Sequence, residues 1–139
     1  MISRDRTTTA FDPATLHLLA DDARGRSFVL DLVGTFRAML HARVTRVVDG
    51  VLAADRAGSM DAVLSLKVSS TMTGAHQLAE IAGSVEGHLR RDDLPAARTE
   101  ALLLPAAAAR AEAAITRYVV SERGPGAAHP AQVAAESIR

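Results

Sequence analysis

Apolar residues recur every three or four positions along most of this chain, which is the spacing of helices that bury one face. The pattern predicts four helices, a short one over residues 12–23 and three long ones over residues 27–57, 59–91 and 93–121. Each predicted start carries a residue whose side chain can cap the first backbone N–H groups of a helix. These capping residues are Asp12, Ser27, Ser59 and the pair Asp92-Asp93, which is followed by Pro95.

The apolar faces of the long helices can be read directly from the spacing. In the second helix the stripe contains Phe28, Leu32, Phe36, Met39, Leu40, Val44, Val47, Val48 and Val51. In the third it contains Val63, Leu66, Ser70, Gly74, Ile81 and Val85, and in the fourth Leu102, Ala108, Ile115 and Val119. Pro105 lies inside the fourth helix, where proline costs about 3 kcal/mol relative to alanine. We expect a kink over residues 101–104, with a break into two helices as the alternative.

One short and three long helices with brief connections predict an all-α fold, an antiparallel up-and-down four-helix bundle. The chain of 139 residues is the size of one domain. We expect the bundle to cover residues 11–121, between a flexible N-terminal segment, 1–10, and a flexible C-terminal tail, 122–139. The tail follows from the turn and linker residues of the sequence ERGPGAAHP, over residues 122–130.

Composition and charge limit the range of possible functions. The chain has no cysteine, which excludes disulfides, thiolate metal sites and a cysteine nucleophile. Sixteen basic and sixteen acidic residues cancel without a basic run, so we expect no nucleic-acid partner. No apolar run approaches the roughly 20 residues of a membrane span, and residues 1–10 lack the apolar stretch of a signal peptide. We therefore expect a cytoplasmic protein that does not enter a membrane.

The basic residues are fifteen arginines and a single lysine, Lys67. It lies in the stretch LKVSSTMTGAHQLAEI, which starts at Leu66 and follows a Gly-Ser turn. This stretch and the order of helices resemble the histidine-containing phosphotransfer (HPt) family of bacterial phosphorelays, whose motif reads His-x-Leu-Lys-Gly-Ser-Ser/Ala, three variable residues, then Gly-Ala. The residues that match in register are Leu66, Lys67, Ser69, Ser70, Gly74, Ala75 and Leu78, and Phe28 and Phe36 upstream also resemble the family. The resemblance covers residues 11–120 and implies an HPt-like bundle that binds response-regulator receiver domains.

Two departures from the motif fall at its functional positions. The phosphoaccepting histidine is replaced by Leu64, and the glycine one turn later by Val68. An aliphatic side chain has no lone pair to attack phosphorus, so Leu64 accepts no phosphoryl group. Glycine in a helix costs about 1 kcal/mol and is kept where another backbone must come close. The paired change therefore indicates a site adapted away from phosphotransfer.

A substitute phosphoaccepting histidine is the alternative, and the positions of the other histidines disfavour it. At about 100° per residue, His76 lies roughly 120° around the predicted third helix from Leu64, and His88 is displaced similarly in the other direction. The remaining histidines, His17, His41 and His129, belong to other segments. None of the histidine pairs has the short helical spacing of metal ligands. We expect no catalytic residue, no metal and no cofactor.

What the site retains is a surface. Leu64, Val68, Thr71 and Ala75, spaced by four, three and four, form a largely apolar outer strip, and such strips commonly mark protein contacts. Lys67 lies beside it, and the resemblance implies that this lysine faces the acidic pocket of a receiver domain. The plainer interpretations are a core-boundary Leu64 and a solvated Lys67. We expect Leu64, Lys67, Val68, Thr71 and Ala75 to form the docking site of a degenerate HPt protein.

Two other functions stay open. The same strip can pair with its copy in a homodimer, which would make the chain a self-associating structural bundle without a phosphorelay role. Small alanine and glycine side chains can also leave room between helices for a small apolar ligand. A conventional enzyme is disfavoured, because the sequence has no nucleophile and base at readable spacing and no glycine-rich phosphate loop.

Overall fold

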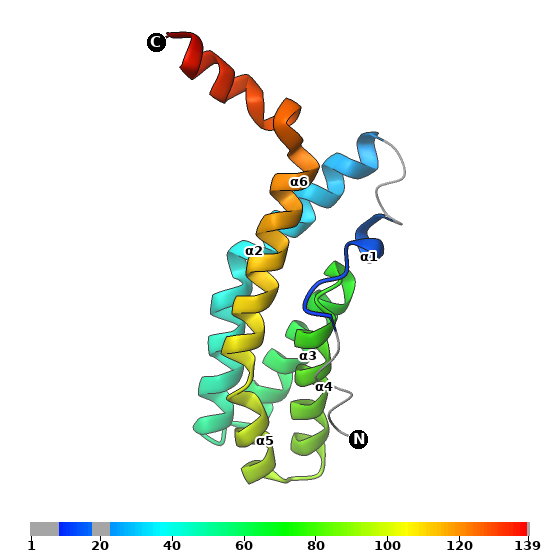
Figure 1. The fold of residues 1–139 in the computed structure, drawn as a ribbon. Helices are drawn as coiled ribbons and strands as arrows, with labels where there is room; N and C mark the ends of the chain where they lie inside the picture. Colours follow the sequence, from blue (N-terminus) through cyan, green and yellow to red (C-terminus); the bar gives the residue numbers. More distant parts are fainter. Residues whose placement is uncertain (1–8, 18–22, 139) are drawn as a thin grey trace.

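The computed structural model describes residues 9–17 and 23–138, and every element in these ranges is a helix (Figure 1). The helices are α1 (Pro13–His17), α2 (Ala23–Leu52), α3 (Arg56–Thr73), α4 (His76–Arg90), α5 (Leu94–Ala101) and α6 (Leu104–Ile138). The predicted all-α class is confirmed. In these ranges no helix is both long enough and apolar enough to cross a membrane.

The helices pack side by side as an antiparallel bundle. α3 lies between α2 and α4, while α5 and α6 together close the bundle against α2 and α4. The direction of α3 relative to α2 follows from two contacts, because Gly50 faces Ser59 while Arg43, earlier in α2, bonds Ser69, later in α3. This arrangement buries the apolar stripe that the spacing predicts for α3 and α4, namely Val63, Leu66, Ser70, Gly74, Ile81 and Val85.

The stripe predicted for α2 is buried only in its later part. Phe36, Leu40, Val44, Val47 and Val51 belong to the core. Phe28 and Met39, by contrast, are exposed, with relative accessibilities of 57% and 42%. In the earlier part of α2 the buried residues are Val29 and Val33, each one position after a predicted member of the stripe, so the predicted phase is correct only from Phe36 onward.

The predicted third helix is two helices, and the single helix over residues 59–91 is wrong. The break lies at Gly74, which has a φ of 89° and ends α3 in the left-handed conformation. Its N–H bonds back to the carbonyl of Thr71, and the N–H of Ala75 bonds to Ser70, as in the C-terminal caps that glycine allows. α4 then runs back along α3. Gly74 and Ala75 thus make a corner, where periodicity alone predicted continuous helix.

Two predicted caps are also wrong. α2 begins at Ala23, so Ser27 lies inside the helix, and α2 ends at Leu52, earlier than predicted. α3 is capped by Asp55, whose side chain accepts a hydrogen bond from Gly58 N–H at 3.0 Å, while Ser59 is buried against α2. Asp55 is the stronger cap here because Ala54, at a φ of 61°, turns the chain just before it.

The cap predicted at Asp12 is confirmed, and of the predicted pair Asp92-Asp93 the capping residue is Asp93. Asp12 Oδ1 accepts a hydrogen bond from Ala14 N–H at 3.0 Å, and α1 begins at Pro13. Asp93 Oδ1 accepts one from Ala96 N–H at 3.2 Å at the start of α5. The predicted end of the first helix near Ala23 depends on residues 18–22, which lie outside the described residues.

Pro105 marks a break, which was the alternative to a kink. α5 ends at Ala101, and α6 starts at Leu104 with Pro105 in its first turn, where a missing N–H leaves no helical bond unmade. α6 continues to Ile138, so the turn predicted for residues 122–130 is wrong (Figure 1). Glycine and proline disfavour a helix without forbidding one.

Two arginines fasten the ends of other helices. Arg56, at the start of α3, donates from Nε and Nη2 to the carbonyl of Leu89 at 3.3 and 3.1 Å, near the end of α4. Arg98 of α5 donates to the carbonyls of Val51 and Leu52, at the end of α2, at 3.4 and 3.2 Å. The carbonyls of Leu89 and Val51 already accept from the backbone N–H groups of Asp92 and Ala54, so each arginine adds a further donor at a helix end, where the helix dipole also favours a cation.

Candidate functional site on the outer face of α3

The candidate site is the outer face of α3, which carries the positions singled out by the sequence. A shallow depression of about 470 Å³ lies over α3 and α2. It is lined by Arg43, Asp61, Leu64, Ser65, Val68, Ser69 and Met72. We call Leu64, Val68, Thr71 and Met72 the α3 strip. Met72 was not predicted, although it lies four residues after Val68 and its spacing could have indicated it.

The strip is apolar and open to solvent. Val68 and Met72 are 54% and 53% exposed, and Leu64 is half-buried at the edge of the core. Thr71 is exposed, but its hydroxyl donates to the carbonyl of Lys67 at 2.8 Å, which leaves the methyl group as its outward feature. Large aliphatic side chains half in water are what a docking surface offers to a partner.

Ala75 does not belong to this surface. It is fully buried at the corner between α3 and α4, so its predicted place on the outer strip is wrong. The prediction extended the spacing of α3 across Gly74, where the helix in fact ends. Ala75 and Gly74 are therefore scaffold residues of the motif.

The two neighbouring serines of the motif, Ser69 and Ser70, make different contacts. Ser69 Oγ donates to the carbonyl of Ser65 and receives a hydrogen bond from Arg43, so it links α3 to α2. Ser70 is buried, and its Oγ has no hydrogen-bond partner among the described residues. Ser69 thus connects two helices, whereas Ser70 is a small side chain packed in the core.

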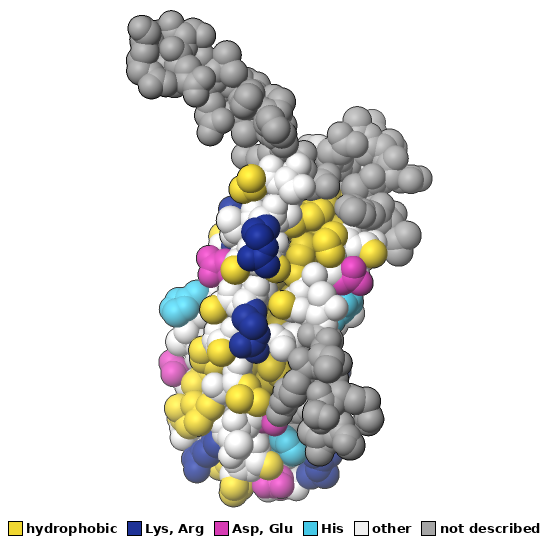
Figure 2. Space-filling view, in the orientation of Figure 1, with side chains coloured by type: hydrophobic (Ala, Val, Ile, Leu, Met, Phe, Trp, Pro, Cys, Tyr) yellow, Lys and Arg dark blue, Asp and Glu magenta, His cyan; other side chains and the backbone are white. Residues whose placement is uncertain are grey.

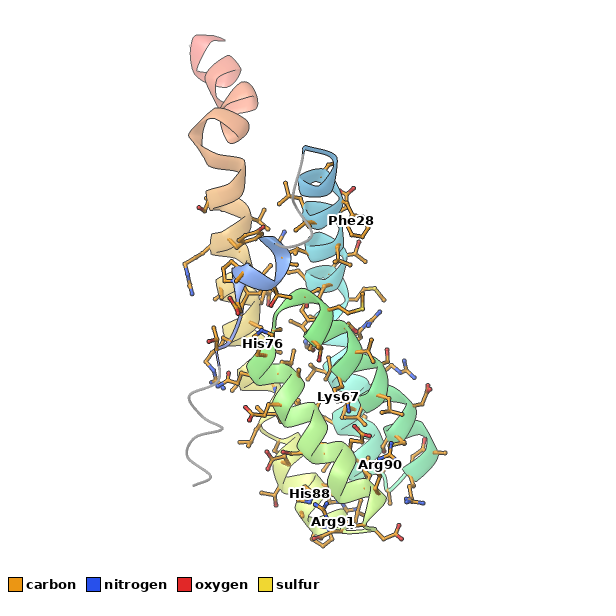
Figure 3. All side chains as sticks on the ribbon, turned by 90° about the vertical axis from the view of Figure 1, so that its right-hand side faces the viewer. Phe28, Lys67, His76, His88, Arg90 and Arg91 are labelled. Atoms are coloured by element: carbon orange, nitrogen blue, oxygen red, sulfur yellow. The ribbon has the colours of Figure 1, made fainter. Side chains whose placement is uncertain are left out.

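Lys67 is not a freely solvated lysine. Its Nζ donates to Oε1 of Glu86 at 2.6 Å, across the α3–α4 pair, and its side chain is 39% exposed (Figure 3). The other oxygen of Glu86 accepts from Arg90. Glu86 itself is nearly buried, with its side chain 11% exposed.

The cations around Glu86 lower the pKa of its carboxyl group. The hydrogen bond from Lys67, and then that from Arg90, hold the pKa of the Glu86 carboxyl below its usual value, while burial opposes this shift. Sequence reasoning missed Glu86 because one continuous helix would place residues 67 and 86 about 28 Å apart at 1.5 Å per residue. The corner at Gly74 folds α4 back and brings them together.

His76 and His88 make contacts away from the strip. His76 begins α4 at the corner, where its Nε2 lies 3.2 Å from Thr15 Oγ1 and 3.6 Å from Asp12 Oδ2 (Figure 3). His88 Nδ1 meets Arg91 at 2.9 Å, and two residues along α4 turn it about 200° from Glu86. The expected angles from Leu64 assumed a continuous helix and no longer apply. Among the described residues, none of the clusters of His, Asp and Glu could hold a metal ion.

Other apolar surfaces lie outside α3. A depression of about 250 Å³ between α2 and α6 is lined by Leu40, Val44, Val48, Pro105 and Ala108, with His41, Asp49 and Glu112 among its polar neighbours. Hydrophobic side chains also gather near the lower end of the face shown in Figure 2. Leu52, Leu102 and Leu103 are exposed large hydrophobic residues outside α3. These surfaces carry none of the motif residues.

Comparisons of the chain with protein-family models, with curated proteins and with solved structures find no match. The geometry of the α3 face is therefore the basis for a functional proposal.

Proposed function

We propose that this chain is an HPt-like signalling protein that docks receiver domains of response regulators without accepting phosphate. The observation that carries the proposal is the α3 strip, an exposed apolar surface at the positions where the resemblance expects a phosphoaccepting histidine and a glycine. Leu64 offers no nucleophile there, and Val68 adds an exposed side chain where the motif has none. The chain then acts as a binding protein and not as an enzyme, in the cytoplasm where receiver domains work.

Charge on both sides of the strip supports an acidic partner. Arg43 reaches α3 from α2 and donates to neutral groups, Ser69 Oγ and Met39 Sδ. On the other side of the strip lie Lys67 and Arg90, which both bond the carboxylate of Glu86. At about 100° per residue, Lys67 and Ser69 lie roughly 200° apart around α3, with the strip between them. Asp61 also lines the depression, but it lies 3.8 Å from Arg46, so its charge is partly balanced. Cations beside an apolar centre match a partner that presents carboxylates beside an apolar patch.

The test is an amide NMR titration of the protein with receiver domains from the same genome, each with and without a phosphoryl mimic. We expect shifts centred on Leu64, Lys67, Val68 and Thr71. Val68→Glu is expected to weaken binding, whereas Val120→Glu is the matched control, because Val120 is a similarly exposed valine on α6, 63% accessible. Absence of shifts with every receiver, or shifts centred on α6, would overturn the proposal.

A gain of function tests the link to phosphotransfer. In the variant Leu64→His with Val68→Gly, an imidazole nitrogen can attack the phosphorus of a receiver's aspartyl phosphate. A P–N bond forms, the P–O bond breaks, and the aspartate leaves as a carboxylate. We expect labelled phosphate on the double variant and none on the parent. A double variant that neither binds a receiver nor gains label contradicts the HPt assignment.

The second candidate is self-association through the same strip. It is favoured by the exposure of Val68 and Met72, because a C2 dimer would bury both side chains of each copy. Light scattering measures the mass directly. A dimer that dissociates on Leu64→Glu would support this function, and a monomer at high concentration would exclude it.

A further inference from the structure

Glu86 holds two cations, one on each oxygen. Lys67 Nζ from α3 lies 2.6 Å from Oε1, while Nε and Nη2 of Arg90 lie 2.9 and 2.7 Å from Oε2. Because Arg90 is four residues after Glu86 on α4, its bond is made within one helix and does not depend on the position of α3. The carboxylate therefore keeps a charged partner whether or not Lys67 is present.

The three side chains differ in access to solvent. The Glu86 side chain is 11% exposed, that of Lys67 39% and that of Arg90 61%. Leaving a nearly buried carboxylate without a cation is costly, but Arg90 removes most of that cost when Lys67 departs. A Cβ placed on Gly83 would lie 3.8 Å from Cδ of Lys67, so the lysine stem rests over a residue that has no side chain to hold it.

We propose that Lys67 is a transferable cation, bound to Glu86 in the free protein and passed to a carboxylate of the docked partner, while Arg90 keeps Glu86 neutralised. The inference rests on the proposed function of the α3 strip, and it deepens that function by naming a residue that sets the affinity. Lys67 adjoins Leu64 and Thr71 on α3, about 60° and 40° away, so an acidic group at the rim of the strip is within its reach. Glu86 competes for Lys67 with the partner.

The competition for Lys67 predicts that substitutions at Glu86 and at Arg90 change the docking affinity in opposite directions. Glu86→Gln removes the competing charge and frees Lys67, so it is expected to tighten docking. Arg90→Gln leaves Glu86 dependent on Lys67 alone, so it is expected to weaken docking. Each change is expected to be about two- to fivefold in Kd, the range of a partly exposed ion pair. A purely structural role of the cluster would move both variants in the same direction.

The experiment is isothermal titration calorimetry with the receiver domain that gives the largest NMR shifts, using the parent, Glu86→Gln, Arg90→Gln and Lys67→Met. Lys67→Met is expected to weaken binding. Combining it with Glu86→Gln is expected to abolish the gain, because the gain acts through Lys67. Circular dichroism melting of each variant confirms that the helices are intact.

The outcomes separate this inference from the proposed function. Both the docking function and the transfer of Lys67 are supported if the parent binds, Glu86→Gln binds more tightly and Arg90→Gln binds more weakly. Parent binding with Glu86→Gln unchanged or weaker overturns the transfer of Lys67 and leaves the docking function standing. Binding by Glu86→Gln alone would also support both, since the parent would then be held back by its own carboxylate. If none of the variants binds any receiver, the docking function is overturned, and this inference with it.

Discussion

Gly74 lies so close to the backbone of Asp12 that a Cβ on the glycine would stand 2.6 Å from the Asp12 carbonyl oxygen. The contact is reinforced in the other direction, because Asp12 N–H donates to the carbonyl of Gly74 at 2.8 Å. The corner between α3 and α4 is thereby joined to the start of α1. The glycine of the motif is required by the scaffold, independently of any phosphotransfer.

Gly74→Ala is therefore expected to destabilise the fold. An alanine at a φ of 89° costs about 1–2 kcal/mol from the left-handed backbone alone, and the contact with Asp12 adds to it. Urea unfolding measures the loss, with Gly34→Ala in α2 as the control, since nothing lies within 4 Å of a Cβ placed there. Equal stability of the two variants would contradict the view that the corner at Gly74 requires glycine.

Ser70→Ala is expected to leave stability unchanged or raise it by about 1 kcal/mol, because a buried hydroxyl without a partner is costly. Ser69→Ala is the matched comparison on the next residue. It is expected to lower stability, because it removes the acceptor of Arg43. Thermal melting of both variants checks the difference in sign, and a loss in Ser70→Ala as large as that in Ser69→Ala would show that the Ser70 hydroxyl is satisfied.

Acid is expected to weaken the contribution of Glu86 to folding. Its carboxyl pKa is lower in the folded protein than the ordinary 4.5, mainly because Lys67 and Arg90 bond its charged form. A lowered pKa stabilises the folded state fully above 4.5, and this contribution is lost as the pH falls through the folded pKa. Glu86→Gln should thus be less stable than the parent at pH 7, and the gap should narrow below pH 4.5.

Urea midpoints of the parent and Glu86→Gln from pH 7 to pH 3 measure this gap. Glu112→Gln, which changes an exposed carboxylate on α6, serves as the control. A gap between the parent and Glu86→Gln that stays constant over this range would argue against the charged cluster.

Lys67 also gives a chemical test that needs no partner, because it is the single lysine of the chain. Its ammonium must leave Glu86 Oε1, 2.6 Å away, before an amine reagent can methylate it. We expect slow reductive methylation in the parent and faster methylation in Glu86→Gln, measured by mass spectrometry of the peptide that contains Lys67. Equal rates would mean that Glu86 does not restrain the lysine in solution.

The sequence predicted the helical class and part of the core because burial repeats with the period of the helix, although Leu102, predicted for the core stripe of the fourth helix, is exposed. Val63, Leu66, Ile81 and Val85 are buried as expected. The positions of the helix ends were less accessible to this reasoning. Asp12 and Asp93 acted as predicted, but Ser27 and Ser59 have the same chemistry and lie within helices. A capping residue indicates where a helix can begin, and tertiary packing decides whether it does.

The candidate site was predicted in part for the same reason. Leu64, Val68 and Thr71 lie together on α3 as predicted, because residues three or four apart share a face wherever the helix ends. Glu86 and Ala75 lie beyond Gly74, so their positions depended on a left-handed residue that periodicity does not reveal. The docking role of Leu64, Lys67, Val68 and Thr71 stays a prediction until a partner is titrated.

Arg56 and Arg98, which bond carbonyls at the ends of α4 and α2, should affect how readily these helix ends open. Helix ends normally exchange their amide hydrogens early, since their last carbonyls hold only water. Here Arg98 binds the carbonyls of Val51 and Leu52, and Arg56 binds that of Leu89. Amides in the final turns of α2 and α4 should then exchange more slowly than those of a helix end without such arginine contacts, which native-state hydrogen exchange would measure.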